Sequence, residues 1–291
     1  MIGTEIRLSV GDGELAGVDF GGRGTPVLLV HGSGQNALSW ADMSTLLVSH
    51  CHLVAIDLRG HGQSALDSTD PEQYWRDLGG VVRALGWSRP VLVGHSTGGY
   101  AVTAAVAAGL VDAAALCVVD GVVLDDRTTA TSAQARWSSP DAIRRMRATF
   151  RYGWRATAEE MHAYIESCVD QAADDWLNAG ARPELVRQMT RRSFLRVGRH
   201  WVRRPSVEEV GIVSAPDPAA PVYPSVDVYE RVGCPMTIVL ASDGFYAERA
   251  AQVQAITDGR PDRALVRLES NHNVPMTRPD DLAAVILHLL Q

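Results

Sequence analysis

Residues 90–108 read PVLVGHSTGGYAVTAAVAA, in which an apolar run leads into a glycine-flanked serine and then into small residues. The apolar run predicts a buried strand, and the small residues predict a helix directly after it. Gly94 to Gly98 form the pattern G-x-S-x-G at the turn between the two. A serine on such a tight turn has an exposed hydroxyl, and the glycines let strand and helix approach closely. The stretch therefore predicts that Ser96 is a nucleophile.

Similar apolar runs recur on both sides of this stretch. They are PVLLV (26–30), HLVAID (52–57), MTIVLA (236–241) and ALVRL (264–268). Helical patterns lie between them, and strands that alternate with helices form mainly parallel sheets through right-handed crossovers. The first two strands differ, because EIRLSV and ELAGVDF flank the turn Gly11-Asp12-Gly13 and read as a hairpin. We therefore expect an α/β fold, with a mostly parallel sheet, helices on both faces and an antiparallel start.

Between residues 125 and 224 the strand pattern stops and amphipathic helical patterns replace it. We expect a core domain made of residues 1–124 and 225–291, and an inserted helical cap made of residues 125–224. The segment from Arg127 to Arg204 contains 15 Arg against 8 Asp and Glu, whereas the whole chain has a net charge of -7. Solvated helix faces explain this excess, and the alternative is a positive field that attracts an anionic substrate.

A serine hydroxyl becomes a good nucleophile when a base removes its proton and an acid orients that base. Of the nine histidines, His272 follows the final predicted strand in the segment SNHNVP, where a loop can reach the carboxyl edge of the sheet. It also fits the chain order serine, acid, histidine. Two acids follow strands and compete for the orienting role, Asp243 after MTIVLAS and Asp120 after ALCVV. We favour Asp243, because its strand directly precedes the one that delivers His272, and keep Asp120 as the alternative.

Attack on a carbonyl group places negative charge on its oxygen, which backbone N–H groups can stabilise. The segment His31-Gly32-Ser33-Gly34 follows the first buried strand and can face the serine turn. We expect the N–H of Ser33 and the N–H of Thr97 to form this oxyanion hole.

Composition narrows the class of protein further. With 46% hydrophobic and 21% charged residues, the chain is typical of a soluble globular protein. The first residues lack the basic and apolar pattern of a secretory signal, and no apolar run is long enough to span a membrane, so we expect a cytoplasmic location. The negative net charge argues against nucleic acid as the partner. No metal-ligand spacing or nucleotide fingerprint is present, so we expect no cofactor and no metal.

Three motifs in order resemble the α/β-hydrolase fold superfamily, in its capped branch of esterases, cofactor-free haloperoxidases and carbon-carbon bond hydrolases. They are HGSG at 31–34, DLRGHGQS at 57–64 and GHSTGG at 94–99. The resemblance implies an eight-stranded sheet, a cap over the active site, and catalytic positions for Ser96, His272 and Asp243. Members that cleave ring-derived carbon-carbon bonds usually carry Asn where this chain has His95, which argues against that activity.

The expected reaction is hydrolysis of a small to medium ester, lactone or thioester through an acyl-enzyme on Ser96. Aromatic residues of the predicted cap favour a small-molecule substrate with an apolar or aromatic acyl part. They are Trp137, Phe150, Trp154, Tyr164, Trp176 and Trp201. We expect a monomer or homodimer without nucleic-acid or membrane partners. The alternatives are a biosynthetic or carbon-carbon bond-cleaving enzyme, and a ligand-sensing receptor that retains the triad.

Overall fold

The computed structural model describes residues 3–137 and 139–290. The side chains of Ala135 and Trp137 lie outside this description, and so does the aromatic prediction made for Trp137. Within the described residues, no helix is long and apolar enough to cross a membrane.

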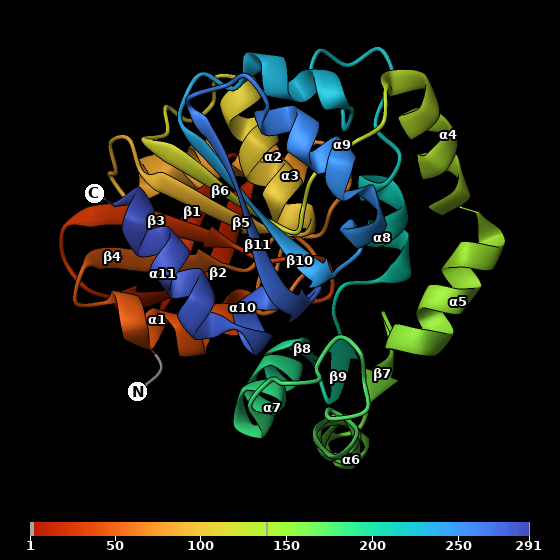
Figure 1. The fold of residues 1–291 in the computed structure, drawn as a ribbon. Helices are drawn as coiled ribbons and strands as arrows, with labels where there is room; N and C mark the ends of the chain where they lie inside the picture. The colour runs from red at the N-terminus through yellow and green to blue at the C-terminus, as the bar shows by residue number, and fades with distance from the viewer. Residues whose placement is uncertain (1–2, 138, 291) are drawn as a thin grey trace.

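One eight-stranded sheet forms the centre of the molecule, as predicted (Figure 1). Its strands run in the order β1-β2-β4-β3-β5-β6-β10-β11. The bounds are β1 Thr4–Val10, β2 Gly13–Gly21, β3 Thr25–Val30, β4 Cys51–Ile56, β5 Val91–His95, β6 Ala115–Val119, β10 Met236–Asp243 and β11 Arg263–Asn271. β1 pairs with β2 and β2 with β4 in antiparallel fashion, whereas every later pairing is parallel. The predicted hairpin and the predicted parallel sheet are both confirmed.

Helices cover both faces of this sheet because the inner strands are apolar on both sides. In β3, Leu28 and Val30 pack on one face, while Val27 and Leu29 pack on the other. The first face is covered by α2 (Gln73–Ala84), α3 (Thr97–Ala107) and α9 (Ala250–Thr257). The second is covered by α1 (Ala41–Leu47) and α11 (Pro279–Leu289). The two apolar layers hold the strands rigidly, so the residues that follow the strands have well-defined positions.

The insert between β6 and β10 contains helices and also a second, three-stranded sheet, β7-β9-β8. Its helices are α4 Arg127–Trp137, α5 Pro140–Phe150, α6 Ala158–Asp170, α7 Pro183–Arg192 and α8 Val207–Val213, and its strands are β7 Arg155–Ala156, β8 Phe194–Val197 and β9 His200–Arg203. The helices expected in the insert are present, and its three short strands are an addition that the sequence pattern did not predict. These strands are two to four residues long, which is too short for a clear alternating pattern.

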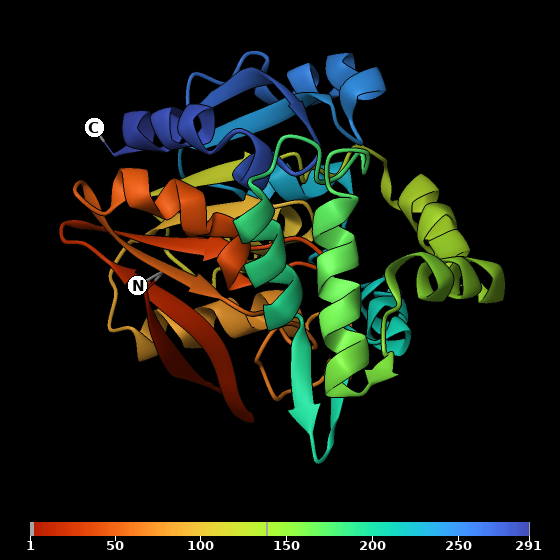
Figure 2. The same ribbon diagram turned by 90° about the horizontal axis from the view of Figure 1, so that it is seen from below.

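The insert lies against the edge of the sheet where its parallel strands end (Figure 1). Helices α6 and α7 lie side by side, with the β8-β9 hairpin projecting beyond them (Figure 2). Side chains of α7 pack directly on the core, where Leu185, Val186 and Met189 share one apolar cluster with Ala41 and Met276. The carboxyl ends of the strands are the usual place for a functional site in such sheets.

Candidate active site

Ser96 lies on the turn between β5 and α3, in a strained conformation with φ 53 and ψ -123. This conformation is held by the close approach of α3 to the neighbouring strand. A Cβ on Gly98 would lie 2.2 Å from the carbonyl oxygen of Val30, so only glycine fits there. Ser96 itself is half-buried, with its side chain at the carboxyl edge of the sheet. The geometry is that of the nucleophile turn expected from G-x-S-x-G.

The imidazole of His272 reaches this hydroxyl from the loop after β11. Its Nε2 lies 3.0 Å from Ser96 Oγ. His272 is 4% exposed, and its ring lies between that of His95, at 4.7 Å between centroids, and that of Phe245, at 4.2 Å. The structure therefore brings together the two side chains that the sequence analysis paired.

The carboxylate that contacts His272 belongs to Asp120, not to Asp243. Asp120 Oδ2 lies 2.6 Å from His272 Nδ1. With φ 40, Asp120 turns sharply at the end of β6, and its other oxygen accepts the N–H of Ala241 at 3.2 Å. Because the carboxylate accepts from Nδ1–H, Nε2 is left free to accept a proton from Ser96.

The preference for Asp243 as the orienting acid is thus corrected by the geometry. The pairing of β10 with β11 shifts register between Ala241 and Asp243, so the end of β10 departs from the regular ladder. Asp243 is exposed, and its Oδ2 accepts the indole N–H of Trp176 at 2.7 Å. It lies near the site without contacting His272.

His95 is a residue of the site to which the sequence analysis gave no functional role. Its Nε2 lies 2.8 Å from the carbonyl oxygen of His272, and its Nδ1 lies 3.0 Å from Gln35 Oε1. A bond to the backbone of His272 holds the loop that carries the imidazole. The one signal available in the sequence was the position of His95 next to Ser96.

The loop of residues 31–34 faces the serine turn, as expected. The hydroxyls of Ser33 and Thr97 lie 3.0 Å apart, which places the two predicted oxyanion residues side by side. Neither backbone N–H donates to another group in the described residues. Thr97 is the first residue of α3, where helix N–H groups lack partners within the helix.

An aromatic surface borders the imidazole. Phe245 is 62% exposed and Trp176 is 39% exposed, and their ring centroids are 5.3 Å apart. Adjacent exposed aromatic rings form a contiguous apolar surface, and such surfaces occur in ligand-binding grooves. The surface therefore offers an apolar wall beside the reacting groups.

A family model described as "Alpha/beta hydrolase family" matches residues 27–285. The chain belongs to the alpha/beta hydrolase family.

In the described ranges 3–137 and 139–290, no group of three or more His, Cys, Asp or Glu side chains could hold a metal ion.

Relatives of this hydrolase include enzymes with named activities. Protein phosphatase methylesterase 1 of Mus musculus is 39% identical over 111 residues, which are 35% of this chain and 29% of the methylesterase. The match thus spans less than a third of that relative. A serine hydrolase-like protein of Danio rerio is 26% identical across 99% of this chain and 88% of its own. Among solved structures, E-2-(acetamidomethylene)succinate hydrolase has a TM-score of 0.74 at 20% identity, covering 99% of this chain and 98% of its own. At that identity, the likeness concerns the fold.

Three buried histidines of this hydrolase predict how its stability depends on pH. Burial lowers the pKa of His31 and that of His95 well below the usual value, and it also lowers the pKa of His61. The folded state favours the neutral form of these rings while the unfolded chain takes up protons below about pH 6.5, so stability falls as the pH falls. Between pH 7.5 and 5.5 we expect a loss of about 1 kcal/mol for each ring.

Urea unfolding at the two pH values measures this loss. His31→Gln should remove about a third of the combined dependence, because one of the three rings is gone. The matched control is His162→Gln on the exposed face of α6, which should leave the dependence as in the wild type. Equal stability of the wild type at both pH values would contradict the prediction.

Proposed function

We propose that this alpha/beta hydrolase is a serine hydrolase that cleaves a small to medium ester, lactone or thioester. The observation that carries the proposal is the continuous chain of hydrogen bonds from Ser96 through His272 to Asp120, with 3.0 Å and 2.6 Å between the bonded atoms. A hydroxyl, an imidazole and a buried carboxylate in this order are the elements of nucleophilic acyl transfer.

In the proposed reaction, Ser96 Oγ bonds to the carbonyl carbon of the substrate while its proton passes to His272 Nε2. The tetrahedral intermediate then collapses, the bond to the leaving group breaks, and the same proton moves to the leaving oxygen or sulfur. Water attacks the acyl-enzyme with His272 again as the base and releases the acid. The carboxylate of Asp120 keeps the imidazole in the correct tautomer and stabilises its protonated form.

The backbone N–H groups of Ser33 and Thr97 are the proposed oxyanion hole. Both lack partners among the described residues, so neither must give up a hydrogen bond when an oxyanion forms between them. Each such donor typically contributes a factor of about 10² to 10³ in rate.

The exposed pair Trp176 and Phe245 supports the expectation of a substrate with an apolar or aromatic part. Phe245 packs against the His272 ring, so a group bound on this surface would lie beside the scissile bond. The methylesterase relative is consistent with ester chemistry, although it shares 35% of this chain.

Labelling with a fluorophosphonate tests the proposal, because this reagent phosphonylates activated serine hydroxyls. We expect one labelled peptide, containing Ser96, and parallel hydrolysis of p-nitrophenyl esters. Ser96→Ala should show neither reaction. Ser242→Ala, at an exposed serine near the end of β10, is the control and should be labelled like the wild type. A wild-type protein that is neither labelled nor active would refute the proposal.

A further inference from the structure

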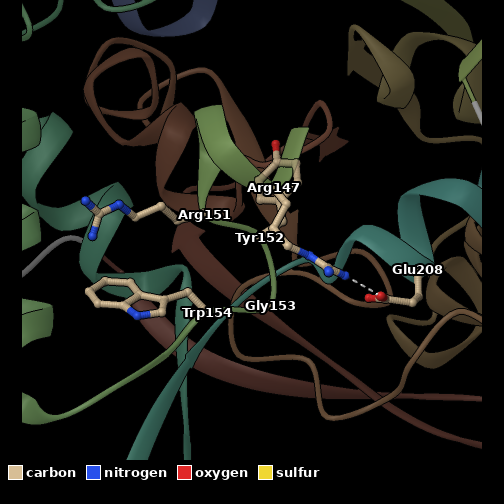
Figure 3. A pocket seen from close by; sticks show the side chains of 6 residues that line it. All are labelled: Arg147, Arg151, Tyr152, Gly153, Trp154 and Glu208. Carbon is tan, nitrogen blue, oxygen red and sulfur yellow. Dashed lines mark hydrogen bonds and ion pairs between the residues drawn. The ribbon is translucent and has the colours of Figure 1, made fainter. Parts of the chain in front are cut away.

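A cavity of about 540 Å³ lies in the insert, beside the segment that joins α5 to β7. Its lining consists of Arg147, Arg151, Tyr152, Gly153, Trp154 and Glu208. Figure 3 shows Arg151 and Trp154 on one side of Gly153 and the Arg147–Glu208 pair on the other. The volume is in the range of small-molecule sites.

The charges around this cavity do not balance. Arg147 is paired with Glu208 at 2.6 Å. The guanidinium of Arg151 contacts no carboxylate in the described residues, and lies instead over the rings of Trp154, at 4.9 Å, and Tyr164, at 5.2 Å. The lining thus carries two guanidinium groups and one carboxylate. Arg151 is exposed, so this excess positive charge is accessible to a ligand.

A second guanidinium without a counter-ion lies directly behind this segment. Arg203 is 8% exposed, and its Nη1 has no hydrogen-bond partner. Its Nε donates to the carbonyl oxygen of Phe150 at 2.7 Å, and its charge lies 5.0 Å from the centroid of Tyr164. A buried cation is costly unless an anion compensates it, so the field in this region favours a negatively charged ligand.

Tyr152 lies between the cavity and the active site. It is 7% exposed and lines the cavity. The hydroxyl reaches the loop of residues 31–34, where a Cβ on Gly34 would lie 2.0 Å from it. Phe150 stacks on the Tyr152 ring at 5.2 Å. The Tyr152 side chain therefore separates the cavity from the loop of residues 31–34.

We propose that this cavity binds a carboxylate group of the substrate, with the guanidinium of Arg151 as its donor. A guanidinium edge matches the two oxygens of a carboxylate, and the single excess charge matches a monoanion. The inference rests on the proposed hydrolase function and specifies its substrate class, a carboxylic ester, lactone or thioester that also carries a free carboxylate.

Pairs of p-nitrophenyl esters with equal acyl chains test this subsite. In each pair one acyl chain ends in a carboxylate and the other in a methyl group, for example hydrogen adipate against hexanoate, with a longer pair of hydrogen suberate and octanoate. We expect the wild type to prefer the carboxylate ester by about tenfold or more in kcat/KM in at least one pair. The preference should appear mainly in KM, since the anion binds away from the reacting carbonyl, and should shrink with added salt.

Arg151→Gln should reduce the preference to about one, because it removes the unpaired charge. The neutral ester of each pair corrects for any general effect of the substitution. Arg144→Gln, on the same helix but exposed and paired with Asp141, is the control and should keep the preference.

Two results would overturn the subsite, namely equal kcat/KM for both members of both pairs in the wild type, or a full preference in Arg151→Gln. These results are distinguishable from a failure of the proposed hydrolase function. If only the subsite proposal is wrong, the wild type still hydrolyses the p-nitrophenyl hexanoate ester and is labelled at Ser96. If the hydrolase proposal is wrong, the wild type does neither, and the subsite proposal is refuted with it.

Discussion

Asp120→Asn is expected to lower kcat/KM for p-nitrophenyl esters by about 10⁴-fold. The amide keeps the shape of the side chain, but its NH₂ group can face His272 Nδ1 and so favour the tautomer that carries the proton on Nε2. In that tautomer the imidazole cannot accept the proton of Ser96, which lies 3.0 Å away. Steady-state kinetics of the purified variant measure the loss, and a near-wild-type thermal midpoint would show that the fold is retained.

Asp243→Asn is the matched control, because it makes the same chemical change at the other acid that follows a strand. Asp243 accepts the indole N–H of Trp176, and an amide oxygen can accept the same bond. We therefore expect a far smaller effect than at Asp120. Equal losses of kcat/KM in the two variants, or a larger loss in Asp243→Asn, would contradict the assignment of Asp120 as the carboxylate that orients His272.

The choice between these two acids also marks the limit of the sequence analysis. Both acids follow predicted parallel strands, so both were predicted at the carboxyl edge of the sheet, and the structure makes those strands, β6 and β10, neighbours. Which carboxylate turns toward the imidazole depends on the positive φ of Asp120 and on the register shift before Asp243. Such local backbone deviations leave no pattern in hydrophobicity or spacing.

The elements that were predictable have strong local causes. β3, β4 and β5 are buried on both faces and therefore read as unbroken apolar runs, and the turn at Ser96 requires glycines at fixed spacing. The short strands of the insert and the role of His95 depend instead on contacts between distant residues. The hydrogen bond from His95 to the carbonyl oxygen of His272 joins positions 177 residues apart. No local sequence pattern predicts such a bond.

Arg192→Met is expected to destabilise the protein by about 3–5 kcal/mol. Arg192 ends α7 in the insert, and its guanidinium lies 3.0 Å from the carboxylate of Asp57, which follows β4 in the core. Both side chains are buried, at 5% and 0% exposure. Methionine replaces the apolar stem but not the charge, so Asp57 would remain a buried anion with two backbone N–H donors, those of Ala37 and Gln63, and no cation.

Urea unfolding measures this loss, and Arg187→Met on the same helix is the control. Arg187 is paired with Glu166 and Glu184 at the surface, where solvent and salt screen such pairs, so we expect little change. An Arg192→Met variant as stable as the wild type would mean that the buried pair contributes nothing.

The position of this pair also predicts the order in which the variant loses structure. Arg192 joins the insert to the core, whereas the sheet has its own two apolar layers. Without the pair, α7 is held on the core by the small apolar cluster around Leu185 and Met189 and by the hydrogen bond from Asn36 Nδ2 to the carbonyl oxygen of Met189. The insert should therefore detach at a lower urea concentration than the sheet unfolds. In Arg192→Met limited proteolysis should then cut within residues 125–224 at urea concentrations that leave the far-ultraviolet circular dichroism of the sheet unchanged, whereas in Arg187→Met cleavage and the dichroism transition should coincide.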